Sequence, residues 1–237
     1  MPTTHAAWRV LPHRPLVQLS ERVWRLEGDL ENMPLKRVMT IARRADGGLV
    51  VHNAIAADDA AMAAIAALGE IRVILIPNGY HRLDAQVFHE RFPTAQVVCP
   101  AGARAKVKEV VPVAATYGDV PADGAVELQT IDGTKDREGA LIVHDRDGVT
   151  VVLNDVVFNM PHAAGVKGFV LKHLTGSTGG VKVTRIARLA LISDKPAVRA
   201  HLERLAALPG LRRVIVSHHE TIDHEPGRAL AAVAATL

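Results

Sequence analysis

The sequence of 237 residues contains a single cysteine and few aromatic side chains. The lone thiol of Cys99 excludes an intrachain disulfide, and its place after Val97 and Val98 predicts a buried strand end rather than a reactive thiol. Aromatic residues make up only 3% of the chain, which argues against binding of single-stranded nucleic acid through stacked bases. Hydrophobic residues nevertheless reach 49%, so Ala, Val, Leu and Ile are expected to fill a sizeable core.

Other absences narrow the class of protein further. No apolar stretch is long enough to span a bilayer, and residues 1–16 lack the apolar run of a signal peptide, which together predict a cytoplasmic protein without a membrane partner. The sequence Gly-x-Ser-x-Gly does not occur, which argues against a serine hydrolase of the α/β type. The net charge is +3, and the basic residues are scattered rather than clustered, so nucleic acid is not an expected partner.

The pattern of apolar residues indicates strands followed by helices, twice over. Aliphatic runs bounded by turn residues predict strands at 23–26, 37–42, 49–52, 71–76, 97–98, 126–128, 140–144, 149–153 and 211–217. Helical spacing and capping residues predict helices at 57–68, 84–91, 103–110, 195–207 and 226–237, with Asp84 as the N-cap of the second. No linker rich in Pro, Gly or Ser separates the halves, roughly 17–115 and 116–237, so residues 1–237 are expected to form a single domain.

The order of these elements resembles the metallo-β-lactamase superfamily over roughly residues 17–225. Residues 46–52 are similar to its early hairpin, and residues 71–76 to the strand that leads into its metal-binding loop. Residues 150–158 are similar to the strand that ends in the family's Gly-Asp, and residues 214–218 to the last strand, which ends in Gly-His. The resemblance implies an α+β fold, a four-layer αββα sandwich with two sheets packed face to face and helices outside.

The metal-binding loop departs from that family. Its signature is His-x-His-x-Asp-His, whose imidazoles and carboxylate hold one or two zinc ions. The matching positions here are Asn78, Tyr80, Arg82 and Leu83, and the cation at the carboxylate position would repel a metal. A branch of unknown function, with a Pro-Asn-x-x-His loop, is closer, because residues 77–81 fit that pattern. The resemblance to this branch implies no particular activity.

Several residues remain candidates for a site. Asp155 and His218 stand where the family keeps metal ligands, and His81 is displaced by one position but follows the same strand end. Asn78, Tyr80, His81 and Arg82 are expected to line a ligand pocket. Each candidate also has an ordinary structural explanation, such as a strand-end carboxylate bonded to backbone amides or a turn-forming asparagine.

Three functional hypotheses follow. The leading one is a protein that has lost the dinuclear zinc centre, carries no metal cofactor, and binds an unknown small molecule or partner. The alternative is a hydrolase with a reduced site in which His81, Asp155 and His218 hold a single zinc or other divalent ion and leave one coordination position open. The third is a structural or oligomerisation module. The distances among the three candidate ligands discriminate between the first two hypotheses.

Overall fold

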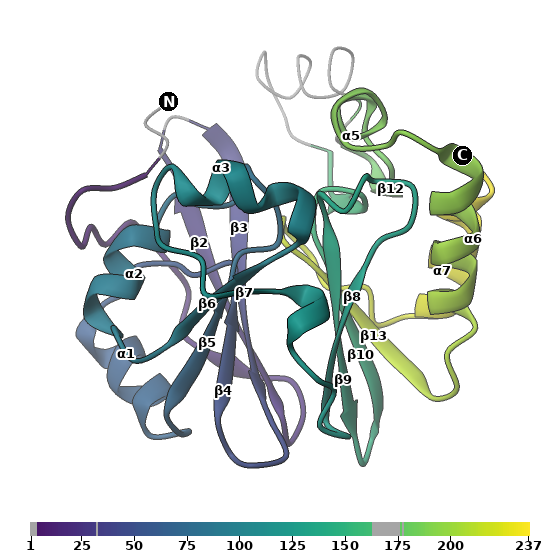
Figure 1. Cartoon of the computed structure of the whole chain (residues 1–237). Coiled ribbons are helices and arrows are strands. Elements are labelled where there is room, and N and C mark those ends of the chain that lie inside the picture. Colours follow the sequence, from purple (N-terminus) through teal and green to yellow (C-terminus); the bar gives the residue numbers. More distant parts are fainter. Residues whose placement is uncertain (1–3, 32, 163–175, 177) are drawn as a thin grey trace.

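The computed structural model describes residues 4–31, 33–162, 176 and 178–237. Two sheets pack face to face, with helices on both outer sides (Figure 1). The first sheet has the order β1 (Val17–Gln18), β2 (Val23–Leu30), β3 (Met33–Arg43), β4 (Leu49–His52), β5 (Ile71–Leu75), β6 (Gln96–Cys99) and β7 (Ala115–Thr116). The second has the order β13 (Leu211–Val216), β10 (Gly148–Leu153), β9 (Gly139–Asp145) and β8 (Val126–Thr130). A small ribbon pairs β11 (Phe158–Met160) with β12 (Gly180–Lys182).

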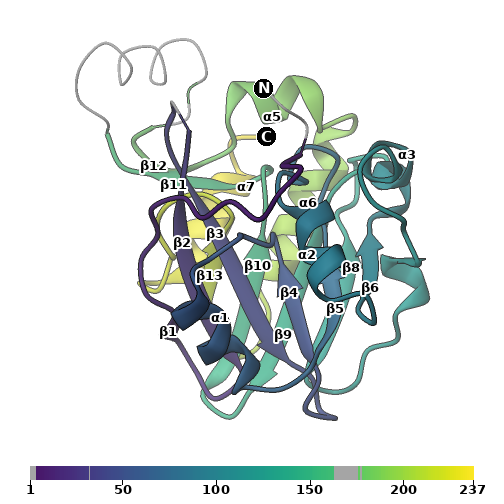
Figure 2. The same ribbon diagram turned by 90° about the vertical axis from the view of Figure 1, so that its left-hand side faces the viewer.

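Helices cover the outer face of each sheet, as both views show (Figures 1 and 2). On the first sheet these are α1 (Asp59–Ala66), α2 (Ala85–Arg91) and the short α3 (Arg104–Lys108), and on the second α5 (Arg185–Ala190), α6 (Lys195–Ala206) and α7 (Pro226–Ala234). Side-chain caps begin three of them: Asp58 accepts a hydrogen bond from the Ala61 amide at 2.8 Å, Asp194 accepts one from the Ala197 amide at 3.1 Å, and Thr184 caps α5. None of the helices in the described ranges is long and apolar enough to cross a membrane.

The core consists of three apolar layers, one between each sheet and its helices and one between the sheets. Leu75 from the first sheet and Val152 and Ile215 from the second lie in the middle layer, and all three are fully buried. The backbone amide of Val38 in β3 donates to the carbonyl of Ser217, the residue after β13, at 2.9 Å, which joins the two sheets directly at this point. The sheets are therefore held together by both apolar packing and main-chain hydrogen bonding.

Strand direction decides where polar side chains gather. β4 and β5 run parallel in the first sheet, and β10 and β13 run parallel in the second. The carboxyl ends of parallel strands lie at one edge of a sheet, which is where ligands bind in many folds that contain them. The segments that follow β5, β10 and β13 carry His81, Asp155 and His218.

Asp84 stands at the N-cap position of α2, as the sequence predicted, but its carboxylate makes no capping hydrogen bond. Asp84 is buried instead, where it accepts a hydrogen bond from His5 Nδ1 at 2.7 Å, another from the Ala56 amide at 3.2 Å, and an ion pair with Arg37. A buried guanidinium needs a charged partner, and this requirement takes precedence over local capping. The pair ties β3 to the segment that carries His81.

Three buried polar side chains occupy the middle layer beside the site: Thr40, His52 and Asn154. Thr40 and His52 are cross-strand partners on β3 and β4. Neither ring nitrogen of His52 makes a hydrogen bond within the described part of the chain. Burial, followed by the charge of His81, lowers the pKa of His52 from 6.5 to about 3. The imidazole is therefore neutral in the folded protein at neutral pH.

This burial predicts a specific acid lability. Between pH 6.5 and 3 the unfolded chain takes up a proton at His52 and the folded chain does not, so stability falls as the pH falls. The slope from this one residue is at most about 1.4 kcal/mol per pH unit. We expect His52→Leu to flatten the acid limb of the stability profile, measured by urea unfolding of chelator-treated protein from pH 7 to pH 4. His224→Leu is the control, since its side chain is 91% exposed. Parallel profiles for wild type and His52→Leu would contradict the prediction.

Candidate functional site

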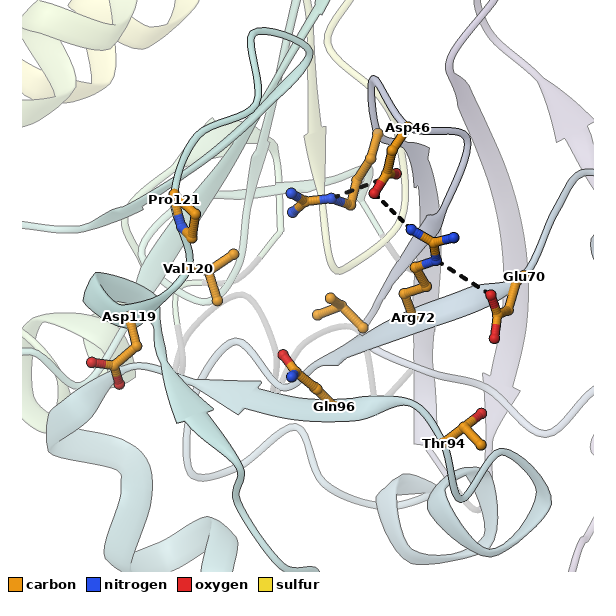
Figure 3. A pocket seen from close by; sticks show the side chains of 10 residues that line it. Asp46, Glu70, Arg72, Thr94, Gln96, Asp119, Val120 and Pro121 are labelled. Carbon is orange, nitrogen blue, oxygen red and sulfur yellow. Dashed lines mark hydrogen bonds and ion pairs between the residues drawn. The ribbon is translucent and has the colours of Figure 1, made fainter.

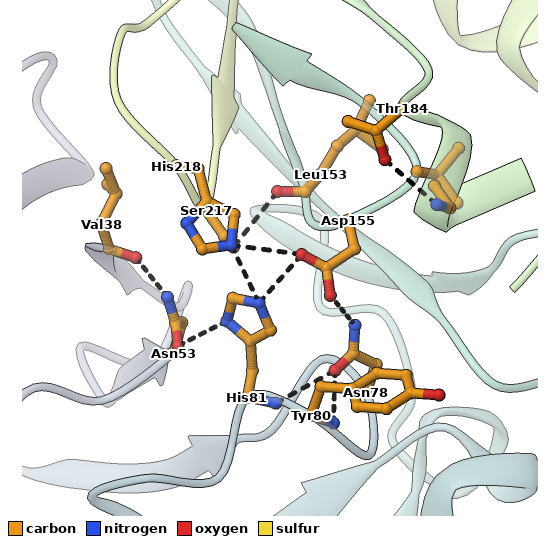
Figure 4. Close-up of polar contacts among 12 residues, drawn as sticks. Val38, Asn53, Asn78, Tyr80, His81, Leu153, Asp155, Thr184, Ser217 and His218 are labelled. Carbon is orange, nitrogen blue, oxygen red and sulfur yellow. Dashed lines mark hydrogen bonds and ion pairs between the residues drawn. The ribbon is translucent and has the colours of Figure 1, made fainter. Parts of the chain in front are cut away.

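Three strand ends deliver two imidazoles and a carboxylate to one point (Figure 4). His81 Nε2 lies 3.0 Å from Asp155 Oδ1, and His218 Nε2 lies 3.2 Å from the same oxygen. The two Nε2 atoms are 3.2 Å apart. All three side chains are at most 16% exposed. The structure therefore brings together the three residues that the sequence singled out as candidate ligands.

The other ring nitrogen of each histidine is bound to an oxygen. His218 Nδ1 lies 2.9 Å from the backbone carbonyl of Lys36, which can only accept, so Nδ1 carries the hydrogen. His81 Nδ1 lies 3.0 Å from Asn53 Oδ1, and the amide nitrogen of Asn53 donates to the Val38 carbonyl at 2.8 Å, which fixes the orientation of the amide. In the neutral imidazoles both Nε2 atoms therefore point lone pairs toward Asp155.

Asn78 fixes the carboxylate and the loop at the same time. Its side-chain oxygen accepts from the amides of Tyr80 at 2.8 Å and His81 at 3.1 Å, so it shapes the turn that presents His81. Its side-chain nitrogen donates to Asp155 Oδ2 at 2.8 Å and to Glu138 Oε2 at 3.0 Å. Asp155 is thereby oriented with Oδ1 toward the imidazoles.

Burial and neighbouring charges shift the protonation of these groups. Burial opposes ionisation of Asp155, but the two imidazoles hold the pKa of its carboxyl well below its usual range. Burial lowers the pKa of His81, although Asp155 acts in the opposite direction. Burial and the charge of Asp155 raise the pKa of Glu138 to about 8. At neutral pH the site therefore contains one carboxylate ion, a neutral His81 and a mostly protonated Glu138.

The donor set suits one divalent cation. Three potential ligand atoms lie 3.0–3.2 Å from one another, and a cation between them would balance the negative charge of Asp155 and the lone pairs of neutral imidazoles. A tetrahedral zinc with ligand bonds of about 2.0–2.1 Å separates its ligand atoms by roughly 3.3 Å, close to the spacing here. Within the described residues, one group of three or more potential metal ligands has its ligand atoms within 4.8 Å of one another. It consists of His81, Asp155 and His218.

A cavity of about 470 Å³ opens from these three residues. Its other walls are largely apolar and include Met33, Leu35, Phe158, Ile186 and Leu191. Tyr80, which the sequence predicted in a pocket, lines it and is 66% exposed. Asn78 is not among the lining residues, but its side chain donates a hydrogen bond to Asp155, which is one of them. Arg82 is not among the lining residues, because its guanidinium is bound to the carbonyl of Lys106 and, at 2.7 Å, to Glu109 on the side of α3.

A second depression lies near the amino ends of β5 and β6 (Figure 3). It has a volume of about 380 Å³ and is lined mainly by charged and polar side chains. Its two arginines are already paired: Arg72 contacts Asp46 at 2.7 Å and Glu70 at 3.3 Å, and Arg44 contacts Asp123 at 3.2 Å. Exposed pairs of this kind contribute little energy, and neither arginine is left as an unpaired cation for a ligand. The candidate site is therefore the cavity at the carboxyl ends of the strands.

Sequence reasoning missed several residues of the site. Asn53 follows β4 directly with a left-handed φ of 56°, and a polar residue at a strand end was the signal that could have revealed it. Phe158 stacks on His218 with ring centroids 4.7 Å apart. Glu138 and the residues of α5 carry no local pattern that marks them. Their part in the site depends on contacts between segments far apart in the sequence.

Comparisons with known proteins identify solved structures with a similar architecture. No protein-family model matches the chain, and no curated protein matches it either. Solved structures do match over nearly their full length. A metallo-β-lactamase from Pontibacter korlensis aligns with a TM-score of 0.60 and 12% identity, covering 94% of this chain and 99% of that one. FIM-1 from Pseudomonas aeruginosa, in a form described as mono-zinc, gives a TM-score of 0.61 and 12% identity, covering 96% of each chain.

A metallo-β-lactamase from Erythrobacter litoralis, with β-mercaptoethanol in its active site, gives a TM-score of 0.62 and 13% identity. It covers 94% of this chain and 96% of its own. Identities this low establish the fold alone and carry no activity with them. They confirm the four-layer αββα sandwich that the order of sequence elements predicted.

Proposed function

Because this chain has the metallo-β-lactamase fold, we propose that it is a metal-dependent hydrolase with a mononuclear site. In this proposal His81, Asp155 and His218 hold one divalent cation, with zinc as the leading candidate. The observation that carries the proposal is the convergence of three potential ligand atoms within 3.2 Å of one another. The mono-zinc description of FIM-1 adds support, since that protein shares the fold.

The surrounding residues are arranged as the supporting shell of a metal site. Asn53 and the Lys36 carbonyl hold each Nδ1–H, which keeps both Nε2 atoms available as ligands. Asn78 holds the far oxygen of Asp155, and Phe158 stacks on the ring of His218. Two imidazoles and one carboxylate leave a position open, as in catalytic zinc sites.

When bound there, a divalent cation supplies a Lewis acid that polarises a carbonyl oxygen and acidifies water at neutral pH. The chain itself contributes orientation and exclusion of solvent. The apolar walls of the cavity exclude water from a bound substrate, and the buried carboxylate and imidazoles face its scissile group. Tyr80, at the mouth, is the one lining phenol and can donate a hydrogen bond to the substrate.

Metal analysis of the purified protein tests the proposal. We expect one equivalent of zinc per chain after dialysis against a zinc-containing buffer, and hydrolysis of 4-nitrophenyl esters that stops on treatment with a chelator and returns with zinc. Protein that binds no stoichiometric divalent metal would contradict the proposal. That outcome would instead favour the alternative of a ligand-binding protein without a metal.

The role of the supporting shell is tested at Asn53. We expect Asn53→Gly to weaken zinc binding about 10- to 100-fold, because His81 loses the acceptor that orients its ring. Glycine is chosen because it adopts the left-handed φ of 56° without strain. Competition with a chromophoric chelator measures the affinity. Asn159→Gly is the matched control, because within the described residues the Asn159 side chain donates to the Glu220 carbonyl and not to a candidate ligand. Equal zinc affinity in the two variants would exclude a positioning role for Asn53.

A further inference from the structure

The cavity above the three candidate ligands is polar at its floor and apolar along its walls. His81, Asp155 and His218 form the floor. Met33 and Leu35 of β3, Phe158 of β11, and Ile186 and Leu191 on or beside α5 supply apolar wall surface. A volume of about 470 Å³ lies within the range of small-molecule pockets, which is about 300–1,000 Å³.

No lysine or arginine lines this cavity within the described part of the chain, and Asp155 is its one acidic residue. The cations around it are engaged elsewhere: Arg37 pairs with Asp84, Lys36 pairs with Asp29, and Lys182 donates to the Thr178 carbonyl. The hydroxyl of Thr184 accepts from the Ala187 amide at 3.0 Å and so caps α5. An anionic group in the body of a substrate would therefore find no counter-charge among the described residues of the walls, and transferring it from water would be costly.

The apolar wall continues onto the surface at the mouth. Ile186 lines the cavity and is 56% exposed, and Tyr80 stands at the mouth with 66% exposure. Exposed apolar side chains beside a cavity extend the surface that an apolar ligand can cover. The cavity and its rim together form one apolar channel that ends at the three polar side chains.

We propose that the substrate is a neutral acyl ester or amide, whose acyl chain lies in this channel and whose carbonyl group reaches the floor. This inference rests on the proposed hydrolase function. In the reaction the oxygen of water forms a bond to the acyl carbon, the bond from that carbon to the alkoxy oxygen or amide nitrogen breaks, and the proton from water passes to the leaving group. The products are a carboxylic acid and an alcohol or amine.

Chain-length dependence tests the substrate class with the zinc-loaded protein. The probes are 4-nitrophenyl esters with acyl chains of increasing length, and bis(4-nitrophenyl) phosphate as an anionic counterpart. Each added methylene that becomes buried is expected to raise kcat/KM about fourfold until the channel is filled, because burial of a methylene is worth about 0.8 kcal/mol. A kcat/KM that is independent of chain length, or higher for the phosphate diester than for every ester, would overturn the inference.

A binding measurement separates this inference from the metal chemistry. Butanamide, hexanamide and octanamide are titrated calorimetrically into chelator-treated protein, and affinity is expected to rise about fourfold per methylene without any metal. Ile186→Asp is expected to weaken octanamide binding at least about tenfold by placing a carboxylate in the wall. Leu189→Asp is the matched control, since Leu189 is on the same helix and 89% exposed but does not line the cavity.

The outcomes for the two proposals are distinguishable. Chain-length-dependent amide binding without zinc binding or hydrolysis would support the apolar channel and reject the hydrolase. Zinc-dependent hydrolysis with no dependence on chain length, and equal binding by the Ile186 and Leu189 variants, would support the hydrolase and reject the acyl substrate. Both variants change exposed positions, so the folded state is expected to be retained, and circular dichroism checks this.

Discussion

Replacement of Asp155 by asparagine is expected to lower zinc affinity by at least about 100-fold, the upper end of the loss seen when only a supporting residue is removed. The carboxylate Oδ1 is the atom that both imidazoles face, at 3.0 and 3.2 Å. An amide of the same shape removes the negative charge and keeps the size of the side chain. The change therefore tests the ligand role with little disturbance of packing.

Zinc-dependent thermal stability gives a readout that does not involve activity. A ligand at 1,000 times its Kd stabilises the folded state by about 4 kcal/mol, and at 10 times its Kd by about 1.4 kcal/mol, so zinc is expected to raise the Tm of Asp155→Asn by at most about a third of the rise in the wild type. Asp223→Asn, an exposed aspartate five residues beyond His218, controls for loss of one negative charge. An equal rise in Tm for all three proteins would show that zinc binds elsewhere.

The second large effect is expected at Asp84. Replacing it with alanine should reduce the free energy of unfolding by about 3–5 kcal/mol, because the buried guanidinium of Arg37 loses its charged partner. His5 and the Ala56 amide lose an acceptor in the same change. Urea unfolding of chelator-treated protein measures the loss without any contribution from metal.

Asp58→Ala is the matched control for Asp84→Ala. It also removes one aspartate, but the lost contacts are an ordinary helix cap to Ala61 and a contact of the exposed Asp58 carboxylate with His13 at 3.6 Å, together worth about 1–2 kcal/mol. The double variant Arg37→Met with Asp84→Leu removes both charges and is expected to recover most of the stability. Losses of equal size at Asp84 and Asp58 would mean that the buried ion pair contributes no more than a cap.

Sequence patterns predicted the fold where local signals and tertiary structure agree. The strands β4, β5, β10 and β13 follow from aliphatic runs bounded by turn residues, and their bounds match to within one residue. The helix α6 follows from Asp194 as its cap and a buried stripe at helical spacing. The order of these elements was sufficient to indicate the αββα arrangement.

The short elements could not be predicted. The strands β1, β7, β11 and β12 contain two or three residues each, too few to show a periodicity. The helix α5 spans six residues and has an exposed apolar side, because Ile186 and Leu189 face outward. Its sequence therefore lacks the separation of apolar and polar residues that marks a helix packed on a core.

Part of the candidate site was predictable from local sequence patterns, and part was not. Asp155 and His218 follow long aliphatic strands, so a sequence pattern locates them. His81 lies in a loop whose shape depends on Asn78, which contacts both the loop amides and Asp155. Only the folded chain shows that a histidine one position out of register reaches the same point. The lining of the cavity depends on β3, β11 and α5 together, and no local pattern predicts that association.

The three candidate ligands come from different sheets, and this makes the geometry of the site sensitive to how the sheets pack. His81 follows a strand of one sheet, and Asp155 and His218 follow strands of the other. The distances between their potential ligand atoms therefore depend on the position of one sheet relative to the other. A change of volume at Leu75 or Ile215, deep in the layer between the sheets, would alter that relative position and move His81 relative to its two partners. Distant packing is thereby transmitted to the candidate site as a change in the distances between its side chains, so if the proposed metal binds there, selection for metal affinity would also act on the apolar interior.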